Sequence, residues 1–178
     1  MSHSLSMLVG SYVVLAMVFG QVARAAEEAA PKPPELKVLD RLVGTWDSES
    51  ISRPAEWTPK EVRLTAVLTR EWVLGGRFVQ ERASDSNKME ATVMFGFDPQ
   101  KKVYRVWRFD SEGSALEMTL QWDEATQTLS GQTDLGNGLT NTTSIHFIDN
   151  DTHEWKGVVK DAAGKVFFDG GGTCRRRK

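Results

Sequence analysis

Apolar and polar residues alternate with a period of two along most of the chain after Trp46. In the segment 61–69, for example, Val62, Leu64 and Leu68 alternate with charged residues and threonines. The alternation recurs through 89–97 and 116–122, and less regularly through six further segments: 77–83, 103–110, 126–134, 142–149, 153–160 and 165–175. Because successive side chains of a strand point to opposite faces, the pattern predicts about ten strands, each with one wet and one apolar face.

Short turn-forming segments separate these strands. The segments 84–87, 98–101, 123–125 and 161–164 are rich in Asp, Ser, Asn and Gly or contain Pro. Short turns join antiparallel neighbours, because a parallel pair needs a crossover of about a dozen residues or more. The sequence therefore predicts an all-β fold, an antiparallel up-and-down β-barrel in which closure removes the exposed edges. A sandwich of two sheets is the alternative architecture.

The segment before Trp46 has a different period. Leu36, Leu39 and Leu42 fall on one helical face, and Gly44 ends the turn, so we expect a short N-terminal helix over one end of the barrel. Residues 26–34 are rich in Pro, Ala and Glu, a composition that favours a loose linker. The predicted folded domain is 35–178.

Residues 1–25 resemble a cleaved export signal. An apolar run covers 5–20, and Ala23-Arg24-Ala25 supplies the small residues that a signal peptidase requires. The run is shorter than the roughly 20 residues that span a bilayer as a helix, so a permanent anchor is the alternative and not the first choice. We therefore predict an exported protein, periplasmic or secreted, with no stable membrane span after cleavage.

Charge and cysteine content narrow the possible partners. The chain has 22 basic and 24 acidic residues, a net charge of −2 that gives no reason to expect a nucleic-acid partner. Cys174 is the single cysteine, which excludes a disulfide within the chain and predicts a small buried side chain. The sequence leaves the oligomeric state open.

Three groups of residues, in this order, suggest a family. The first is the run from Leu36 to Trp46, in which Leu36, Leu39 and Leu42 are three residues apart and Gly44 lies two residues before Trp46. The second is 74–78 (Leu-Gly-Gly-Arg-Phe), and the third is 96–98, which precedes the aromatic segment that contains Tyr104 and Trp107. Together they resemble a bacterial family of uncharacterised lipocalin-like domains. The resemblance implies a calycin-type barrel with an internal cavity and no established reaction. A more distant resemblance links the chain to fatty-acid-binding proteins and to the haem-carrying nitrobindins.

The lipocalin resemblance also implies structural roles. Gly44 and Trp46 would open the first strand, and a basic residue of the last strand would pack on Trp46. Arg175 or Arg177 is expected in that position. The three glycines at 170–172 are a departure, and we expect them to weaken the pairing of the last strand.

Motifs of the common enzyme classes are missing from the sequence. It has no His-Glu-x-x-His, no paired-cysteine metal spacing, no Gly-x-Ser-x-Gly and no phosphate loop. We therefore expect no enzymatic activity and no cofactor. The exception to consider is haem: a neutral histidine that faces an apolar cavity suits axial ligation, and His153 is the better candidate, with His146 in reserve. The alternative is a hydrogen-bonded core histidine or a surface one.

Three arginines have the parity of the apolar face or nearly so: Arg70, Arg105, and Arg82, which shares its parity with Phe78. A buried guanidinium is costly unless it is paired, so each is expected either to match a carboxylate or to bind an anionic ligand. Together with Tyr104, such an arginine would recognise the carboxylate of a fatty-acid-like molecule. The alternative is an arginine that reaches water or pairs with Asp110 or Glu117.

Tryptophans on the predicted strands either line a cavity or fill the core. Trp107, Trp122 and Trp155 are the candidates for contact with a ligand. The resulting prediction is a non-enzymatic protein that binds a small apolar or amphipathic molecule inside the barrel. The alternatives are a haem-based enzyme or sensor with His153 as ligand, and a ligand-free structural or interaction module.

Overall fold

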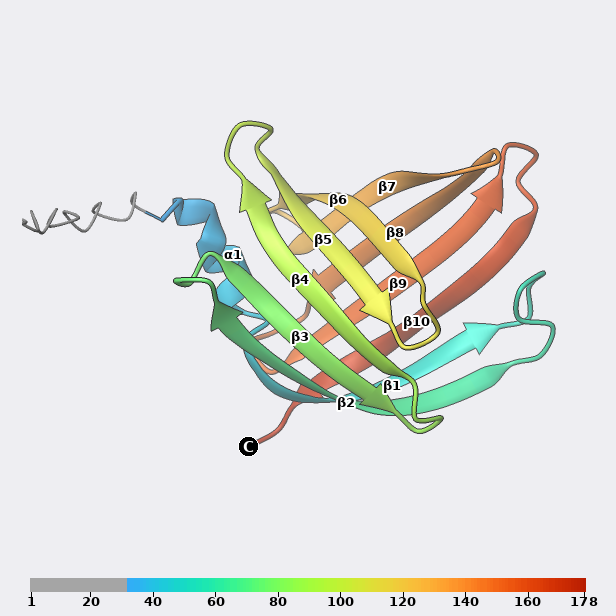
Figure 1. Ribbon diagram of the computed structural model, residues 1–178, viewed down its shortest axis with the longest axis horizontal. Helices are drawn as coiled ribbons and strands as arrows, with labels where there is room; N and C mark the ends of the chain where they lie inside the picture. The colour runs from blue at the N-terminus through green and yellow to red at the C-terminus, as the bar shows by residue number, and fades with distance from the viewer. Residues whose placement is uncertain (1–31) are drawn as a thin grey trace, which may run out of the picture. The chain divides into compact units, whose positions relative to one another are not determined.

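Ten antiparallel strands form a closed barrel in the computed structural model, which describes residues 32–178 (Figure 1). Each strand pairs with its neighbours along the chain, and β1 pairs with β10 to close the ring. The predicted all-β, up-and-down barrel of about ten strands is therefore confirmed. In chain order the strands are β1 (Gly44–Arg53), β2 (Val62–Val73), β3 (Phe78–Asp85), β4 (Glu90–Asp98), β5 (Val103–Asp110), β6 (Ala115–Asp123), β7 (Thr128–Gly136), β8 (Leu139–Phe147), β9 (Thr152–Asp161) and β10 (Val166–Arg176).

The predicted signal peptide (1–25) and most of the predicted linker (26–34) lie outside the described residues, which begin at Lys32. The first helical turn starts at Pro34, close to the predicted start of the domain. Within 32–178, no helix has both the length and the apolar character needed to cross a membrane.

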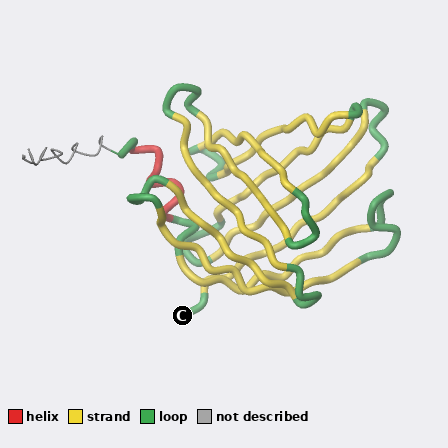
Figure 2. The backbone as a smooth tube through the Cα atoms, in the orientation of Figure 1, coloured by secondary structure: helices red, strands yellow, loops and turns green. Residues whose placement is uncertain are grey.

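Aspartates stabilise the connections between the strands, which are short loops for the most part (Figure 2). Seven of them accept hydrogen bonds from backbone N–H groups of the turn that follows: Asp85, Asp98, Asp110, Asp123, Asp134, Asp149 and Asp161. These bonds satisfy turn amides that have no partner in the strand ladder. The turn signals in the sequence thus become hairpins between antiparallel neighbours.

A short helical segment closes one end of the barrel. The turn η1 (Pro34–Leu36) continues into α1 (Lys37–Asp40), and its spacing directs Leu36, Leu39 and Leu42 to the interior, where Leu39 and Leu42 are 0% exposed. They pack in one core cluster with inward residues of β3 to β8, among them Val79 and Leu129. Burial of each leucine contributes about 1.5–3 kcal/mol, so the predicted helix is an integral part of the core.

The glycines of β10 do not weaken its pairing, contrary to our expectation. Gly170, Gly171 and Gly172 pair with β1 on one side and with β9 on the other. A Cβ atom at Gly170 would lie 2.4 Å from the ring of Phe168, and one at Gly172 would lie 2.8 Å from the indole of Trp155. Gly170 and Gly172 are needed because aromatic side chains occupy the space beside them.

The ring of hydrogen bonds is thinnest between β6 and β7. Three residue pairs join these strands, from Gln121–Ser130 to Asp123–Thr128, although each strand has nine residues. Beyond them the two strands diverge toward the end opposite α1 (Figure 1). A Cβ atom at Gly131, the next residue of β7, would lie 2.0 Å from the carbonyl oxygen of Thr119, so only glycine permits this close approach. Backbone groups on the facing edges past this point are available to water or to a ligand.

Candidate functional site

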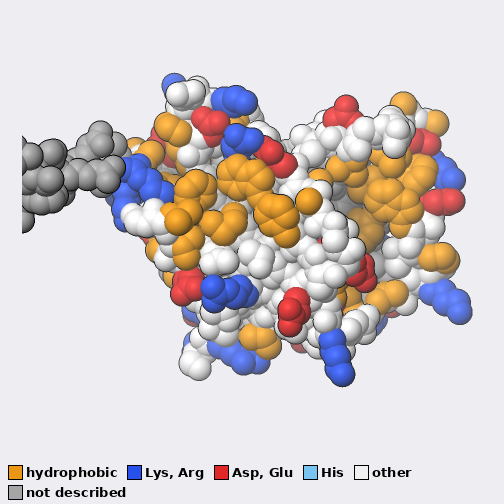
Figure 3. All heavy atoms as spheres, viewed as in Figure 1, with side chains coloured by type: hydrophobic (Ala, Val, Ile, Leu, Met, Phe, Trp, Pro, Cys, Tyr) orange, Lys and Arg blue, Asp and Glu red, His pale blue; other side chains and the backbone are white. Residues whose placement is uncertain are grey.

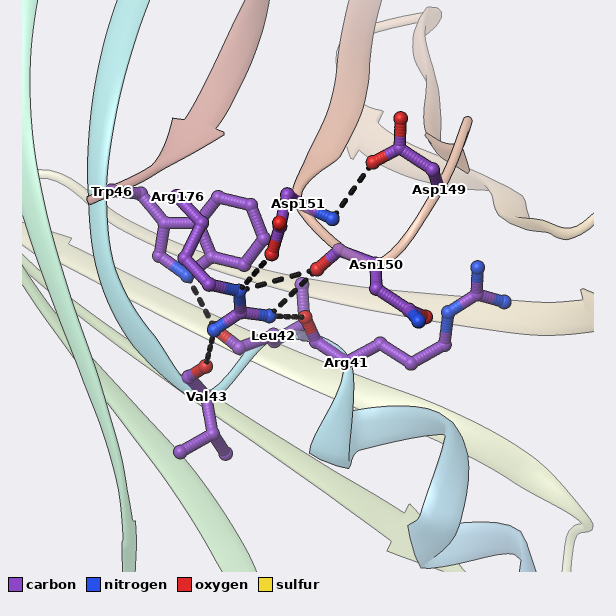
Figure 4. Close-up of polar contacts among 8 residues, drawn as sticks. All are labelled: Arg41, Leu42, Val43, Trp46, Asp149, Asn150, Asp151 and Arg176. Carbon is purple, nitrogen blue, oxygen red and sulfur yellow. Dashed lines mark hydrogen bonds and ion pairs between the residues drawn. The ribbon is translucent and has the colours of Figure 1, made fainter. Parts of the chain in front are cut away.

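Arg176 and Trp46 seal the barrel at the α1 end (Figure 4). The guanidinium of Arg176 lies 4.1 Å from the centroid of the Trp46 ring. We expected Arg175 or Arg177 here, and that expectation is wrong. Side chains alternate along β10, so Arg176 points inward and its two neighbours point outward, where they pair with carboxylates of β1.

Arg176 also ties together three segments of the chain. Its guanidinium donates hydrogen bonds to backbone and side-chain oxygens after α1 and in the β8–β9 turn, namely those of Arg41, Val43, Asn150 and Asp151 (Figure 4). The Trp46 indole N–H donates to the carbonyl oxygen of Leu42 at 2.7 Å. Gly44 has a φ of 127°, and a Cβ atom there would lie 2.4 Å from the guanidinium, so both its conformation and its space require glycine.

Arg70 faces the interior, as predicted, but its charge is already matched. Its Nε donates to the carboxylate of Glu81 at 2.6 Å, and both side chains are buried. Its Nη1 donates to His153 Nε2 at 3.0 Å. A buried guanidinium is stable only with such partners, so Arg70 belongs to a closed polar network and is not available to an anionic ligand.

His153 is the neutral member of this network and is 1% exposed. Burial, and then the positive charges of Arg70 and Arg176, lower the pKa of His153 to about 3. An arginine has no acceptor, so Nε2 accepts the hydrogen bond from Arg70 and the proton of the neutral ring is on Nδ1. Within 32–178, Nδ1 has no hydrogen-bond partner.

This environment does not fit an axial haem ligand. The Trp46 and Phe147 rings lie 4.4 and 5.8 Å from the His153 ring, and the lone pair of Nε2 is engaged by Arg70. Axial ligation needs a free ring nitrogen that faces a cavity. His146, the reserve candidate, is exposed on β8. No cluster of three or more His, Cys, Asp or Glu residues in the described part of the chain is arranged to hold a metal ion.

Arg105 and Trp107 lie on the outer face of the barrel, so the prediction that they face the interior is wrong. Their partners on β6 are Thr119 and Glu117, which are exposed. Arg105 forms an ion pair with Glu117, the alternative considered from the sequence, and its guanidinium lies 5.1 Å from the Trp107 ring. The error has a physical cause: β5 carries apolar side chains on both faces, and Trp107 and Phe109 belong to the outer one.

Tyr104 and Trp122 belong to the end closed by the helix. The Tyr104 hydroxyl donates to the carbonyl oxygen of Glu35 at 2.9 Å, and burial, followed by the charges of Glu35 and Glu124, raises the pKa of Tyr104 to about 12. The Trp122 indole N–H donates to Glu124 at 2.7 Å, and its ring packs on Phe147. Both side chains therefore support the closed end and do not line an opening.

The half of the interior opposite α1 is incompletely filled. Leu64, Leu116 and Phe168 point inward there and remain partly exposed, whereas the inward leucines beside α1 are almost completely buried. Figure 3 shows a hollow in the surface at this end of the molecule, with hydrophobic side chains inside it. We call this space the open half, and the interior between α1 and His153 the closed half. Trp155 lies between them, because it packs on the core and is still partly exposed.

Arg108 faces the open half and was not singled out from the sequence. Its cross-strand partners are Val93 and Leu116, so it shares their inward face. Its Nη1 donates to Asp110 at 2.7 Å. The Ser114 backbone N–H, and then Arg108, keep the pKa of the Asp110 carboxyl below its usual value. The sequence does contain a signal for this facing: Arg108 is an even number of residues from Tyr104, so the two side chains lie on the same face of the strand, whereas Arg105 lies on the other face.

Asn141 is a second polar residue of the open half that sequence reasoning missed. It is 7% exposed and lies opposite Val159 on β9. Its amide nitrogen donates to the Thr143 hydroxyl at 3.0 Å and approaches the sulfur of Met118 at 3.8 Å. It lies in the polar run Asn141-Thr142-Thr143, where no apolar alternation reveals which residues face inward.

The outer face carries shallow grooves as well. One lies over β8 and β9 and is lined by Thr142, Ser144 and Lys156 among others. This groove runs between the outward side chains of neighbouring strands, and none of the polar residues that line it is buried.

Solved structures with a similar fold support the barrel architecture. A crystal structure of Rv2717c from M. tuberculosis superposes with a TM-score of 0.61 and 10% identity over 83% of this chain and 100% of that one. A protein of unknown function from the DUF3598 family of Nostoc punctiforme superposes with a TM-score of 0.50 and 10% identity over 78% of this chain and 48% of that one. At such identities the similarity shows the fold alone.

Sequence comparison gives a family but no closer relative. No curated protein matches the chain. The predicted links to fatty-acid-binding proteins and nitrobindins stay predictions. Residues 32–167, most of the barrel, match the family described as protein of unknown function (DUF1579), so the chain belongs to the DUF1579 family.

Proposed function

We propose that this protein binds a small apolar or amphipathic molecule in the open half of its barrel. The observation that carries the proposal is that inward apolar side chains such as Leu64, Leu116 and Phe168 stay partly exposed while the other half of the interior is packed. Exposed apolar surface inside a concave wall is favourable to cover, at about 25 cal/mol per Å². The divergence of β6 from β7 gives a ligand a way in.

Binding is also a better account of the polar groups than catalysis. The buried histidine is hydrogen-bonded to Arg70 in the closed half, away from the recess. The carboxylates at the open end, such as Asp85 and Asp161, accept backbone N–H groups of their own turns. These groups stabilise the protein, so we propose a non-enzymatic role that needs no cofactor.

The test is a titration with N-phenyl-1-naphthylamine, a neutral apolar probe whose fluorescence rises on leaving water. We expect saturable binding at one site. Ala91 points inward at the open end, whereas its neighbour Thr92 points outward, because Ala91 pairs with Ala83 and Thr92 with Arg82. Ala91→Trp should weaken probe binding at least about tenfold by filling the recess, and Thr92→Trp should leave it unchanged.

Two results would count against the proposal. A probe that fails to bind the folded protein would favour a ligand-free structural or interaction module. A probe that binds Ala91→Trp as well as the unmodified chain would place its site outside the barrel. Circular dichroism of both variants shows whether the barrel is intact, so that a loss of binding is not mistaken for unfolding.

We further propose that the protein acts outside the cytoplasm. The support is the sequence of residues 1–25, with its apolar run and the small residues Ala23 and Ala25. The intact mass of the protein isolated from its native cells should correspond to a chain that starts at Ala26. A full-length chain recovered from the cytoplasmic fraction would contradict this proposal.

A further inference from the structure

We infer that the open half selects flat, aromatic anions over saturated amphiphiles of the same size. The inference rests on the proposed binding function and adds the chemical class of the ligand. It follows from three features that face one another across the recess: an aromatic wall on β9 and β10, two unpaired polar atoms beside that wall, and the guanidinium of Arg108 on the opposite side of the barrel.

The aromatic wall is formed by Trp155 and Phe168. A Cβ atom at Gly170 would lie 2.4 Å from the Phe168 ring, and one at Gly172 would lie 2.8 Å from the Trp155 indole nitrogen. The position of a Cβ atom at Gly157 is within 4 Å of both side chains. Gly170 and Gly172 therefore leave space for the two rings beside the strands, and the rings also come close to Gly157. Two aromatic side chains thus line this wall of the recess, and another aromatic ring can pack against them.

Two polar atoms next to this wall have no partner in the described chain. They are the indole N–H of Trp155 and the side-chain oxygen of Asn141, which is 4.0 Å from the Cβ position of Gly157. Fully buried side-chain atoms without a partner occur, within 32–178, at Arg41 and His153. The Trp155 and Asn141 atoms are therefore open to the interior. A ligand with a hydrogen-bonding edge would satisfy them.

Arg108 supplies the positive charge opposite the wall. In the ring of ten strands, β5 is five places from β10, so Arg108 and Phe168 project from opposite walls, both near the open end. Asp110 holds one arm of the guanidinium and leaves Nε and Nη2 without a partner among the described residues. The side chain is 33% exposed, so a carboxylate that enters the recess can reach a donor already fixed in place.

Three probes with equal numbers of carbon atoms separate these contributions: naphthalene-2-carboxylate, undecanoate and naphthalene-2-carboxamide. We expect isothermal titration calorimetry to give naphthalene-2-carboxylate an affinity about tenfold higher than either of the other two. The difference from undecanoate reports the aromatic wall. The difference from the carboxamide reports Arg108.

Adjacent or nearby residues provide matched controls. Phe168→Leu should remove the preference for naphthalene-2-carboxylate over undecanoate, while Phe167→Leu, which changes an outward ring packed on Trp57, should keep it. Arg108→Met should remove the preference for the carboxylate over the carboxamide. Arg105→Met alters an outward arginine and should have no effect.

The outcomes distinguish this inference from the function on which it rests. If undecanoate binds as tightly as naphthalene-2-carboxylate, or if none of the three probes binds while N-phenyl-1-naphthylamine does, the inference is overturned and the proposed function stands. If none of the four binds, both fall. Preferences that survive Phe168→Leu and Arg108→Met would also overturn the inference, because the selectivity would then come from other residues.

Discussion

The closed and open halves of the barrel are built from the same ten strands, but they differ in what fills the interior. In the closed half, Leu39 and Leu42 from the helical segment enter the barrel, and inward leucines of the strands, such as Leu120 and Leu129, are almost completely buried. In the open half no segment of residues 32–178 enters the barrel, and inward glycines and alanines replace larger residues. Alternation along each strand thus fixes which side chains face inward, and the size of those side chains decides whether the interior is a core or a recess.

The largest difference between the halves should appear when a leucine is truncated. Leu39→Ala removes a side chain that is 0% exposed and should lower the free energy of unfolding by about 3–5 kcal/mol. Leu116→Ala, at a partly exposed inward position, should cost no more than about 1–2 kcal/mol. Urea denaturation measures both. Equal losses would mean that the open half is packed as tightly as the closed half.

The seal at the closed half gives the next effect. Arg176→Met keeps an apolar contact with Trp46 but removes the hydrogen bonds to backbone and carboxylate oxygens, which should lower the free energy of unfolding by about 2–3 kcal/mol. Arg175→Met changes an exposed neighbour and should cost at most about 0.5 kcal/mol. The same urea experiment would refute the assignment of the seal to Arg176 if the two costs were reversed.

Gly131 tests the boundary between paired and diverging strands. Gly131→Ala places a methyl group against the Thr119 carbonyl oxygen and should destabilise the barrel by about 1–3 kcal/mol. It should also speed amide hydrogen exchange at the ends of the β6–β7 ladder. Gly157→Ala is the control, because its Cβ atom would be at an ordinary contact distance of 3.6 Å, and it should change stability by less than about 1 kcal/mol. Unchanged exchange in Gly131→Ala would show that β6 and β7 are not held together at this point.

The smallest expected effect is a pH dependence that comes from the closed half. The folded protein keeps His153 neutral down to a pKa of about 3, whereas the unfolded chain protonates this histidine near 6.5. The unfolded state therefore binds more protons as the pH falls from 6.5 toward 3, and stability declines over that range. Between pH 6.5 and 5.5 the decline should be about 1 kcal/mol.

His153→Gln is the matched variant for this measurement. Its amide oxygen can accept the hydrogen bond from Arg70, but the side chain does not titrate. Unfolding free energies of the two proteins, measured from pH 5.5 to 7, should differ in slope by the contribution of one histidine. Parallel curves would mean that His153 is not kept neutral by the fold.

The sequence predicts the architecture of this protein better than its site. The fold depends on local signals, namely a period of two that recurs from strand to strand, aspartates at seven of the turns and a leucine helix before Gly44. The site depends on the facing of individual side chains. Arg105 and Arg108 lie on opposite faces of β5, and Arg175 and Arg176 lie on opposite faces of β10. Assigning the wrong face to a strand therefore exchanges an inward arginine for an outward one.

Strand β5 shows why parity was misjudged. Trp107 and Phe109 give the outer face as much apolar character as Tyr104 and Val106 give the inner one. Hydrophobicity alone then does not show which face of the strand points into the barrel. The partners across the sheet settle the question, and they are known only once the register is known. The inward facing of Asn141 could not be predicted for the opposite reason, because the residues around it are polar on both faces of the strand.

The order of the strands has a consequence for how the molecule is made. Nine of the ten pairings join strands that follow each other in the chain, and these hairpins can form locally, before the ring is closed. The tenth, between β1 and β10, joins segments more than a hundred residues apart and includes Arg176. Until β10 joins, β1 lacks a neighbour on one side, so the folding chain has to keep this edge from aggregating before the ring can be completed.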